Sequence, residues 1–156
     1  MKKLLVILLL FLTAGLPLAQ SRASMASPVV KGTPEEITIV ARFSDFNADD
    51  EYRIGVGTIK SGLPSAQITL DKDDAAISAS LSDFEQGYTG SWWGVDKVNL
   101  RGFQIPGPAG SDLTLKLVVP RAEAESAEKI YLLVAKKYGE NVWYVEDGIE
   151  LTKENW

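Results

Sequence analysis

"DLTLKLVV", residues 112–119, decides the fold class, because its large apolar side chains recur at every second position. Leu113, Leu115, Leu117 and Val119 form that series, and a period of two is typical of a β-strand with one face against a core. An amphipathic helix would instead repeat its apolar residues at intervals of three and four. The stretch therefore predicts a strand.

Similar short runs lie on both sides of this strand, and turn-forming clusters such as "NADDE", "DKDD" and "PGPAGS" separate them. We predict further strands at "EITIVARF" (36–43), "YRIGVGTI" (52–59), "AQITL" (66–70), "AAISASL" (75–81), "KVNLRGFQI" (97–105), "KIYLLVAKK" (129–137) and "NVWYVED" (141–147). Helical composition is confined to "PRAEAESAEK" (120–129). The pattern predicts an all-β protein with a single antiparallel β-sandwich, immunoglobulin-like or jelly-roll-like, of about seven or eight strands.

The first residues have the pattern of a secretory signal peptide. Lys2 and Lys3 precede the apolar run "LLVILLLFL" (4–12), and small residues follow it. We predict a signal peptide over 1–23, with alternative cleavage at 19 or 26, then a flexible segment over 24–35 and the sandwich domain over 36–156. An uncleaved anchor is the alternative, but a spanning helix needs roughly 20 apolar residues. We therefore expect a secreted or periplasmic protein with no transmembrane span in its mature chain.

The amino-acid composition excludes several classes of partner and of catalytic or metal site. The chain has 16 basic and 21 acidic residues, and loss of Lys2, Lys3 and Arg22 with the leader brings the net charge from −5 to −8. Such a surface repels phosphate backbones, so we expect no nucleic-acid partner. The sequence has no histidine and no cysteine, which excludes His-based nucleophile triads, His-ligated metals and disulfides. We expect no cofactor, with calcium as the one candidate.

The calcium hypothesis rests on "DFNADDE" (45–51). Asp45, Asn47 and Asp49 supply oxygen atoms at alternate positions, as at the start of a calcium-binding loop. The pattern then departs from that loop, because Asp50 stands where a glycine is needed and Val56 where a glutamate would close the site. A solvated acidic turn is the favoured interpretation, and calcium binding is the alternative.

A second candidate site is "YTGSWWGVD" (88–96), which places Trp92 and Trp93 between glycines in a turn-prone stretch. In a locally extended chain, neighbouring side chains point to opposite faces. We therefore expect one tryptophan to be buried and the other to be exposed for binding, although the sequence does not say which is which. Alternatively, both rings cap an open end of the sandwich.

A third candidate is the hairpin expected over 129–147. In a simple register, Tyr131, Leu133 and Ala135 share a face with Val142 and Tyr144, and Trp143 lies on the opposite face. Both faces are apolar, so either the hairpin is covered on both sides, which we favour, or one face is an exposed aromatic platform. The candidate ligand-binding residues from both stretches are Tyr88, Trp92, Trp93, Tyr131, Trp143 and Tyr144.

Carboxylate pairs provide a weaker argument for catalysis. Glycoside hydrolysis needs two carboxyl groups across a cleft, and Asp83 with Glu85, or Glu146 and Asp147 with Glu150, are close in sequence. A simpler explanation of these carboxylates is that they are exposed charges on the surface of a small sandwich. We therefore predict an exported, non-catalytic module that binds another protein of the envelope or extracellular space. A carbohydrate-binding module that recognises a polysaccharide is the alternative, and a small carboxylate-based hydrolase comes third.

Overall fold

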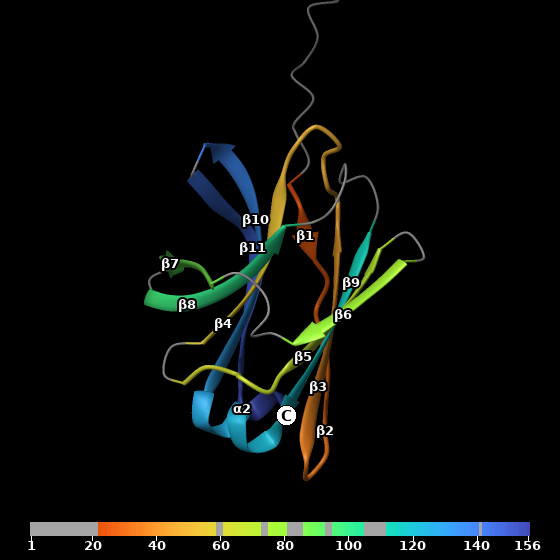
Figure 1. The fold of residues 1–156 in the computed structure, drawn as a ribbon, viewed down its shortest axis with the longest axis vertical. Helices are drawn as coiled ribbons and strands as arrows, with labels where there is room; N and C mark the ends of the chain where they lie inside the picture. The colour runs from red at the N-terminus through yellow and green to blue at the C-terminus, as the bar shows by residue number, and fades with distance from the viewer. Residues whose placement is uncertain are drawn as a thin grey trace, which may run out of the picture.

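The computed structural model describes residues 22–58, 61–72, 75–80, 86–92, 95–104, 112–140 and 142–156, and their side chains up to residue 71 and from residue 112. In these ranges the chain forms two antiparallel sheets, which face each other as a sandwich with a short helix at one end (Figure 1). The predicted single all-β sandwich is therefore confirmed.

The first sheet has the strand order β1-β3-β9-β5-β6, and β2 also pairs with β3. The bounds of its strands are β1 Ser24–Met25, β2 Val29–Gly32, β3 Glu36–Ser44, β5 Gln67–Lys72, β6 Ala75–Ser80 and β9 Leu113–Pro120. The second sheet has the order β11-β10-β4-β8-β7. Its strands are β4 Tyr52–Thr58, β7 Gln86–Trp92, β8 Val95–Gln104, β10 Lys129–Gly139 and β11 Val142–Thr152.

The core lies between the two sheets and is built from residues at alternate positions. On the first sheet, β3 and β9 pair so that buried residues stand opposite one another, for example Ile39 opposite Leu117 and Ala41 opposite Leu115. The second sheet contributes the buried residues Tyr52, Ile54, Val56, Ile130, Leu132 and Val134. The period of two in residues 112–119 thus reflects burial of one face of β9, as predicted.

Three strands were not expected from the sequence. We predicted a flexible segment over 24–35, but β1 and β2 lie within it and pair with β3. The stretch around the adjacent tryptophans, interpreted as a loop, contains β7, which pairs with β8. These strands are short or rich in glycine and polar residues, so pairing with an existing strand edge defines them more than any hydrophobic period of their own.

The helix α2 (Arg121–Ala127) follows β9 and buries Ala124 and Ala127. Glu128 ends it with a positive φ of 62°, and the N–H of Glu128 donates to the carbonyl of Ala124. Within the helix, Arg121 pairs with Glu125 at 3.7 Å. No helix in the described ranges is long and apolar enough to cross a bilayer.

The two ends of the described chain lie at opposite ends of β3. Ser24 in β1 pairs with Ser44, the last residue of β3. After β11, the 3₁₀ turn η2 (Lys153–Asn155) leads to Trp156. A Cβ atom added at Gly32 would lie 3.5 Å from the carbonyl carbon of Trp156, and Gly32 pairs with Ile37 near the start of β3.

We predict that Leu115→Ala destabilises the protein by about 2–5 kcal/mol, because Leu115 is fully buried between the sheets and alanine leaves a cavity. Its neighbour Lys116 is exposed on the same strand, so Lys116→Ala is the matched control and should stay within about 0.5 kcal/mol. Urea unfolding of both variants measures the difference. Equal losses would contradict the assignment of the β9 faces.

Candidate functional site

Exposed apolar side chains gather at one end of the β10–β11 hairpin. Among the described side chains, four large hydrophobic ones are exposed: Val29 (56%), Tyr138 (62%), Val142 (47%) and Tyr144 (58%). The last three stand close together in sequence around the hairpin turn. We call Tyr138, Val142 and Tyr144 the tyrosine cluster.

The two rings of the tyrosine cluster contact each other. The ring centroids of Tyr138 and Tyr144 are 4.9 Å apart, and the ring planes meet at 85°. This edge-to-face arrangement is favourable for aromatic pairs. It fixes two phenol groups in an exposed position, and it presents a ridged surface, since perpendicular rings do not form a flat one.

The observed hairpin register differs from the expected one. Ala135 pairs with Val145 and Lys137 with Trp143, so Trp143 shares the face of Ala135. Tyr144 pairs with Lys136 and lies on the opposite face. The expected assignment of Trp143 and Tyr144 was therefore wrong: an irregularity between Lys137 and Gly139 tightens the turn, and a shift of one residue moves every side chain to the other face.

An ion pair lies beneath the tyrosine cluster. Lys136 is in the core-facing row of β10, where its side chain is 9% exposed, and its Nζ atom is 2.6 Å from Oδ2 of Asp50. The same ammonium group lies 5.3 Å from the centroid of the Tyr138 ring. The hydrogen bond to Asp50 outweighs burial and raises the pKa of Lys136. The lysine therefore stays charged and links the turn before β4 to the base of the cluster.

Trp143 lies on the outer face of the second sheet and is already in contact with cations. The guanidinium carbon of Arg53 is 4.2 Å from the centroid of the indole ring, and Nζ of Lys137 is 6.0 Å from it. Such distances are typical of cation–π contacts. Because Arg53 covers a face of the ring, Trp143 is a poor stacking platform for a ligand.

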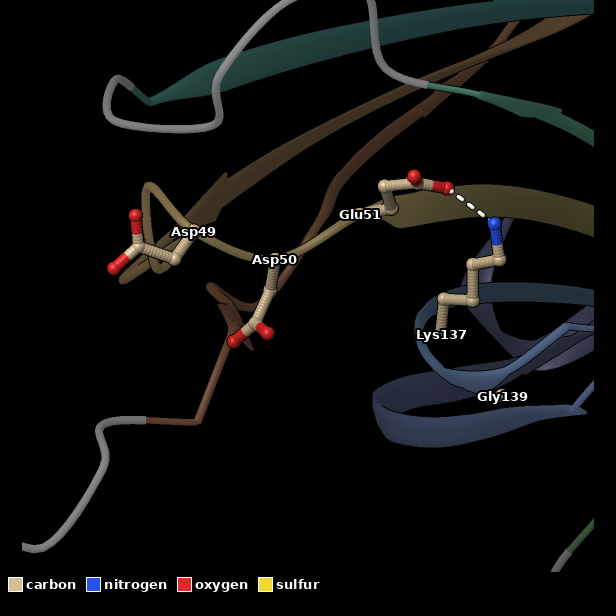
Figure 2. Close-up of a pocket in the computed structure, with 5 residues that line it drawn as sticks. All are labelled: Asp49, Asp50, Glu51, Lys137 and Gly139. Carbon is tan, nitrogen blue, oxygen red and sulfur yellow. Dashed lines mark hydrogen bonds and ion pairs between the residues drawn. The ribbon is translucent and has the colours of Figure 1, made fainter.

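A small open hollow of about 250 Å³ adjoins the hairpin. Asp49, Asp50, Glu51, Lys137 and Gly139 line it (Figure 2). Within it, Lys137 pairs with Glu51 at 2.8 Å, as the dashed line in Figure 2 shows. The hollow thus offers carboxylate oxygens beside the tyrosine cluster.

Tyr131 is not part of an exposed platform. Its side chain is fully buried, and its hydroxyl donates to Oε2 of Glu150 at 2.8 Å. Lys129 contacts the other oxygen of Glu150 at 2.9 Å. Burial and this hydrogen bond raise the pKa of Tyr131 to about 12, and the bond from Lys129 lowers the pKa of Glu150. Tyr131 therefore has a structural role, as expected if both hairpin faces are covered.

The tryptophan stretch is described only in part. Tyr88 and Trp92 belong to β7, and Trp92 pairs with Val95 in β8. Their side chains are not described, and Trp93 lies outside the described residues. The expectation that one tryptophan is buried and the other exposed stays a prediction.

The proposed calcium ligands make contacts within the chain. Oδ2 of Asp45 accepts a hydrogen bond from the hydroxyl of Ser24 at 2.5 Å, and Oδ1 of Asn47 accepts from the N–H of Asp49 at 3.4 Å. In the part of the chain that the structure describes, no group of three or more acidic residues has the spacing of a metal site. Calcium binding stays a prediction.

The described carboxylates considered for catalysis are engaged in structural contacts. Glu146 accepts a hydrogen bond from the N–H of Ala23, Asp147 from those of Met25 and Gly148, and Glu150 contacts Lys129 and Tyr131. Asp83 and Glu85 lie outside the described residues. These contacts give the hydrolase hypothesis no support.

Sequence reasoning missed Tyr138, Val142 and the Lys136–Asp50 pair. One signal was available: "KKYGENV" has an aromatic and an aliphatic residue flanking a predicted turn, where polar residues are usual. The Lys136–Asp50 pair had no such signal, because it joins residues far apart in the chain.

Neither a protein-family model nor a curated protein matches the sequence. Among solved structures, the chain is similar to the collagen-binding domain of a Staphylococcus aureus adhesin, with 9% identity, a TM-score of 0.42, and coverage of 90% of this chain and 98% of that one. It is also similar to the collagen-binding subdomain of an Enterococcus faecalis surface protein (10% identity, TM-score 0.34, 88% and 100% covered). A third is the collagen-binding domain of an Erysipelothrix rhusiopathiae surface protein (11%, 0.35, 89% and 44%). Similarity this distant does not assign a function to the chain.

We predict that Tyr131→Phe removes a contribution to the free energy of unfolding that the parent protein loses only at alkaline pH. The folded-state pKa of about 12 lies above the ordinary value of 10.0, so the hydrogen-bonded phenol contributes fully below pH 10 and its contribution is lost as the pH rises through 12. At neutral pH the variant should lose about 1–3 kcal/mol, because Glu150 loses a buried donor.

Unfolding free energies measured across alkaline pH test this. Tyr144→Phe is the control, since its ring is exposed and its substitution should change stability by less than about 0.5 kcal/mol. An alkaline profile of Tyr131→Phe identical to that of the parent protein would contradict the assignment.

The calcium hypothesis has its own test. If Asp45, Asn47 and Asp49 bind calcium, millimolar Ca²⁺ raises the melting temperature, because a ligand bound to the native state alone stabilises it. Asp49→Ala should abolish the rise without breaking the contact between Asp45 and Ser24. A melting temperature that Ca²⁺ leaves unchanged would rule the site out.

Proposed function

We propose that this protein is an exported binding module that recognises another protein of the envelope or extracellular space through the tyrosine cluster. The observation that carries the proposal is the grouping of Tyr138, Val142 and Tyr144, three of the four exposed large hydrophobic side chains in the described residues, at one hairpin end. Apolar side chains that gather on a surface mark interaction sites more often than scattered ones do.

The chemistry of the cluster suits a protein partner. Tyrosine is enriched among the residues that carry most of the binding energy at protein interfaces, because it offers a large apolar ring and a hydroxyl group at low entropic cost. The edge-to-face contact holds both rings in place before binding, which reduces the ordering cost further. Beneath them, the opposite charges of Lys136 and Asp50 cancel, so the pair adds no strong electrostatic field to the surface.

Carbohydrate binding is the second candidate. The hollow lined by Asp49, Asp50 and Glu51 adjoins the cluster and offers carboxylate oxygens to sugar hydroxyls. Two features favour the protein partner: perpendicular tyrosine rings present no flat surface to a sugar ring, and Arg53 covers the indole of Trp143. Export is part of the proposal because of the predicted signal peptide.

Binding to two arrays tests the proposal, one of purified extracellular and envelope proteins and one of glycans. Collagen belongs among the proteins, because the structural neighbours named above bind it. We expect a protein ligand whose Kd rises at least about tenfold, equivalent to 1.4 kcal/mol, in the variants Tyr138→Ser and Tyr144→Ser.

Val29→Ser is the matched control, since Val29 is similarly exposed but lies on β2 of the other sheet. All three variants should keep the melting temperature of the parent protein. Glycan binding that requires the tyrosines would favour the carbohydrate module instead. A protein ligand whose Kd is unchanged by both substitutions would place the binding surface elsewhere.

A further inference from the structure

The strand β1 is bound along both of its edges. On one side it pairs with β3, and the N–H of Ala26 donates to the carbonyl of Arg42 at 2.9 Å. On the other side, the N–H groups of Ala23 and Met25 donate to carboxylate oxygens of Glu146 and Asp147, each at 2.7 Å. An edge strand usually leaves its outward N–H groups to solvent, whereas here the opposite sheet provides an acceptor for both.

A β-bulge positions the two carboxylates. Val134 pairs with Asp147 and Ala135 with Val145, so Glu146 is an extra residue in β11. An extra residue bends the strand and re-aims its side chains. Glu146 and Asp147 thus reach across the edge of the sandwich to the N–H groups of Ala23 and Met25, and they join the second sheet to the first.

Ala23 is the first residue of the hydrophobic core in the part of the chain that the structure describes. Its side chain is 1% exposed and belongs to the main core cluster, whereas Arg22 is exposed. Removal of Ala23 would therefore take away a core methyl group and the hydrogen-bond donor of Glu146. Removal as far as Ala26 would also delete the Met25 N–H that donates to Asp147 and both residue pairs between β1 and β3.

We propose that the leader peptide is removed upstream of Ala23, by hydrolysis of the Ser21–Arg22 peptide bond, so that Ala23 and β1 stay in the mature protein. The proposal rests on the export proposed above. Ala19 and Ser21 occupy the third and the last positions before this bond, where signal peptidases require small residues. Water adds across the amide, leaving a carboxylate on Ser21 and an ammonium group on Arg22.

The proposed bond differs from the sites expected from the sequence. Cleavage after Ala23 or Ala26 satisfies the same small-residue rule but removes contacts of the folded domain. Cleavage after Ala19 keeps those contacts but places Pro17 at the third position back, where a small residue is needed. Ser21–Arg22 meets both requirements.

The intact mass and the N-terminal sequence of the exported protein test the proposal. The full chain is expressed in a bacterial host and recovered from the periplasm or medium, and the mature protein should begin at Arg22. A start at Gln20, Ser24 or Ser27 overturns the proposed bond while export holds. A membrane-bound product that still carries Met1 would instead overturn export itself.

Two substitutions make the test specific. Ser21→Leu places a large residue directly before the proposed bond, so the precursor should accumulate; because Ser21 is also the third residue before the Ala23–Ser24 bond, the N-terminal sequence of the parent protein is what separates these two bonds. Ala26→Leu is the matched control: it blocks the most C-terminal alternative site at an exposed position, and processing should remain as in the parent chain. Accumulation with Ala26→Leu and normal processing with Ser21→Leu would contradict the proposal.

The contribution of Ala23 to the stability of the domain can be measured separately. Chains that begin at Arg22 and at Ser24 differ by Arg22 and Ala23 alone, and the longer chain should melt several degrees higher because it keeps Ala23 in the core. Equal melting temperatures would show that Ala23 does not stabilise the domain and would remove the basis of the proposal.

Discussion

The strand β10 must be covered on both faces, and much of the structure depends on this constraint. Six consecutive residues, Ile130 to Ala135, are fully buried. A strand of this kind can lie only in the interior of a sheet, with packed layers above and below it. β4 and β11 flank it, and the core shared with β3 and β9 covers its inner side.

The outer side of β10 needs a separate solution, because the other sheet does not reach it. Tyr131 meets this need with a hydrogen bond to Glu150 that satisfies its buried hydroxyl. Leu133 packs over Gly55 on β4, where a Cβ atom would lie 2.9 Å from Cγ of Leu133, so a larger residue at this position would displace Leu133. Further along the strand, Arg53 and Trp143 stack on each other.

Beyond Ala135 the core ends, Lys136 pairs with Asp50, and the exposed tyrosines follow. The candidate binding surface thus lies where β10 extends beyond the core and Tyr138, Val142 and Tyr144 become exposed.

The sequence allows the strands with a strong period to be predicted, and for a physical reason. Burial of one face of β3 and of β9 imposes alternation on "EITIVARF" and "DLTLKLVV", and both strands were predicted within a residue or two. β1 and β2 are too short to show a period, and most positions of β7 are glycine or polar residues. For the site, the hairpin and its aromatic character were predictable, and Tyr144 was among the candidate residues, whereas the exposure of Tyr138 and Val142 was not predicted. The irregularities in β11 and at the turn each shift the alternation by one residue, and turn type and bulges depend on the packing of the whole sheet. Tyr131, a candidate ligand-binding residue, is buried because the outer face of β10 is covered there, whereas Tyr138 lies beyond the covered part and is exposed.

The placement of the chain ends has a mechanical consequence. Ser24 pairs with one end of β3, and the backbone of Trp156 lies near Gly32 at the other end (Figure 1). A pulling force applied between these two residues acts along the axis of β3. It loads the ladder between β1 and β3 in shear, together with the two bonds to Glu146 and Asp147. Hydrogen bonds loaded in this direction share the force and rupture together, whereas a force across the strands would peel them apart one at a time. Tension between these two residues would therefore meet collective resistance at β1.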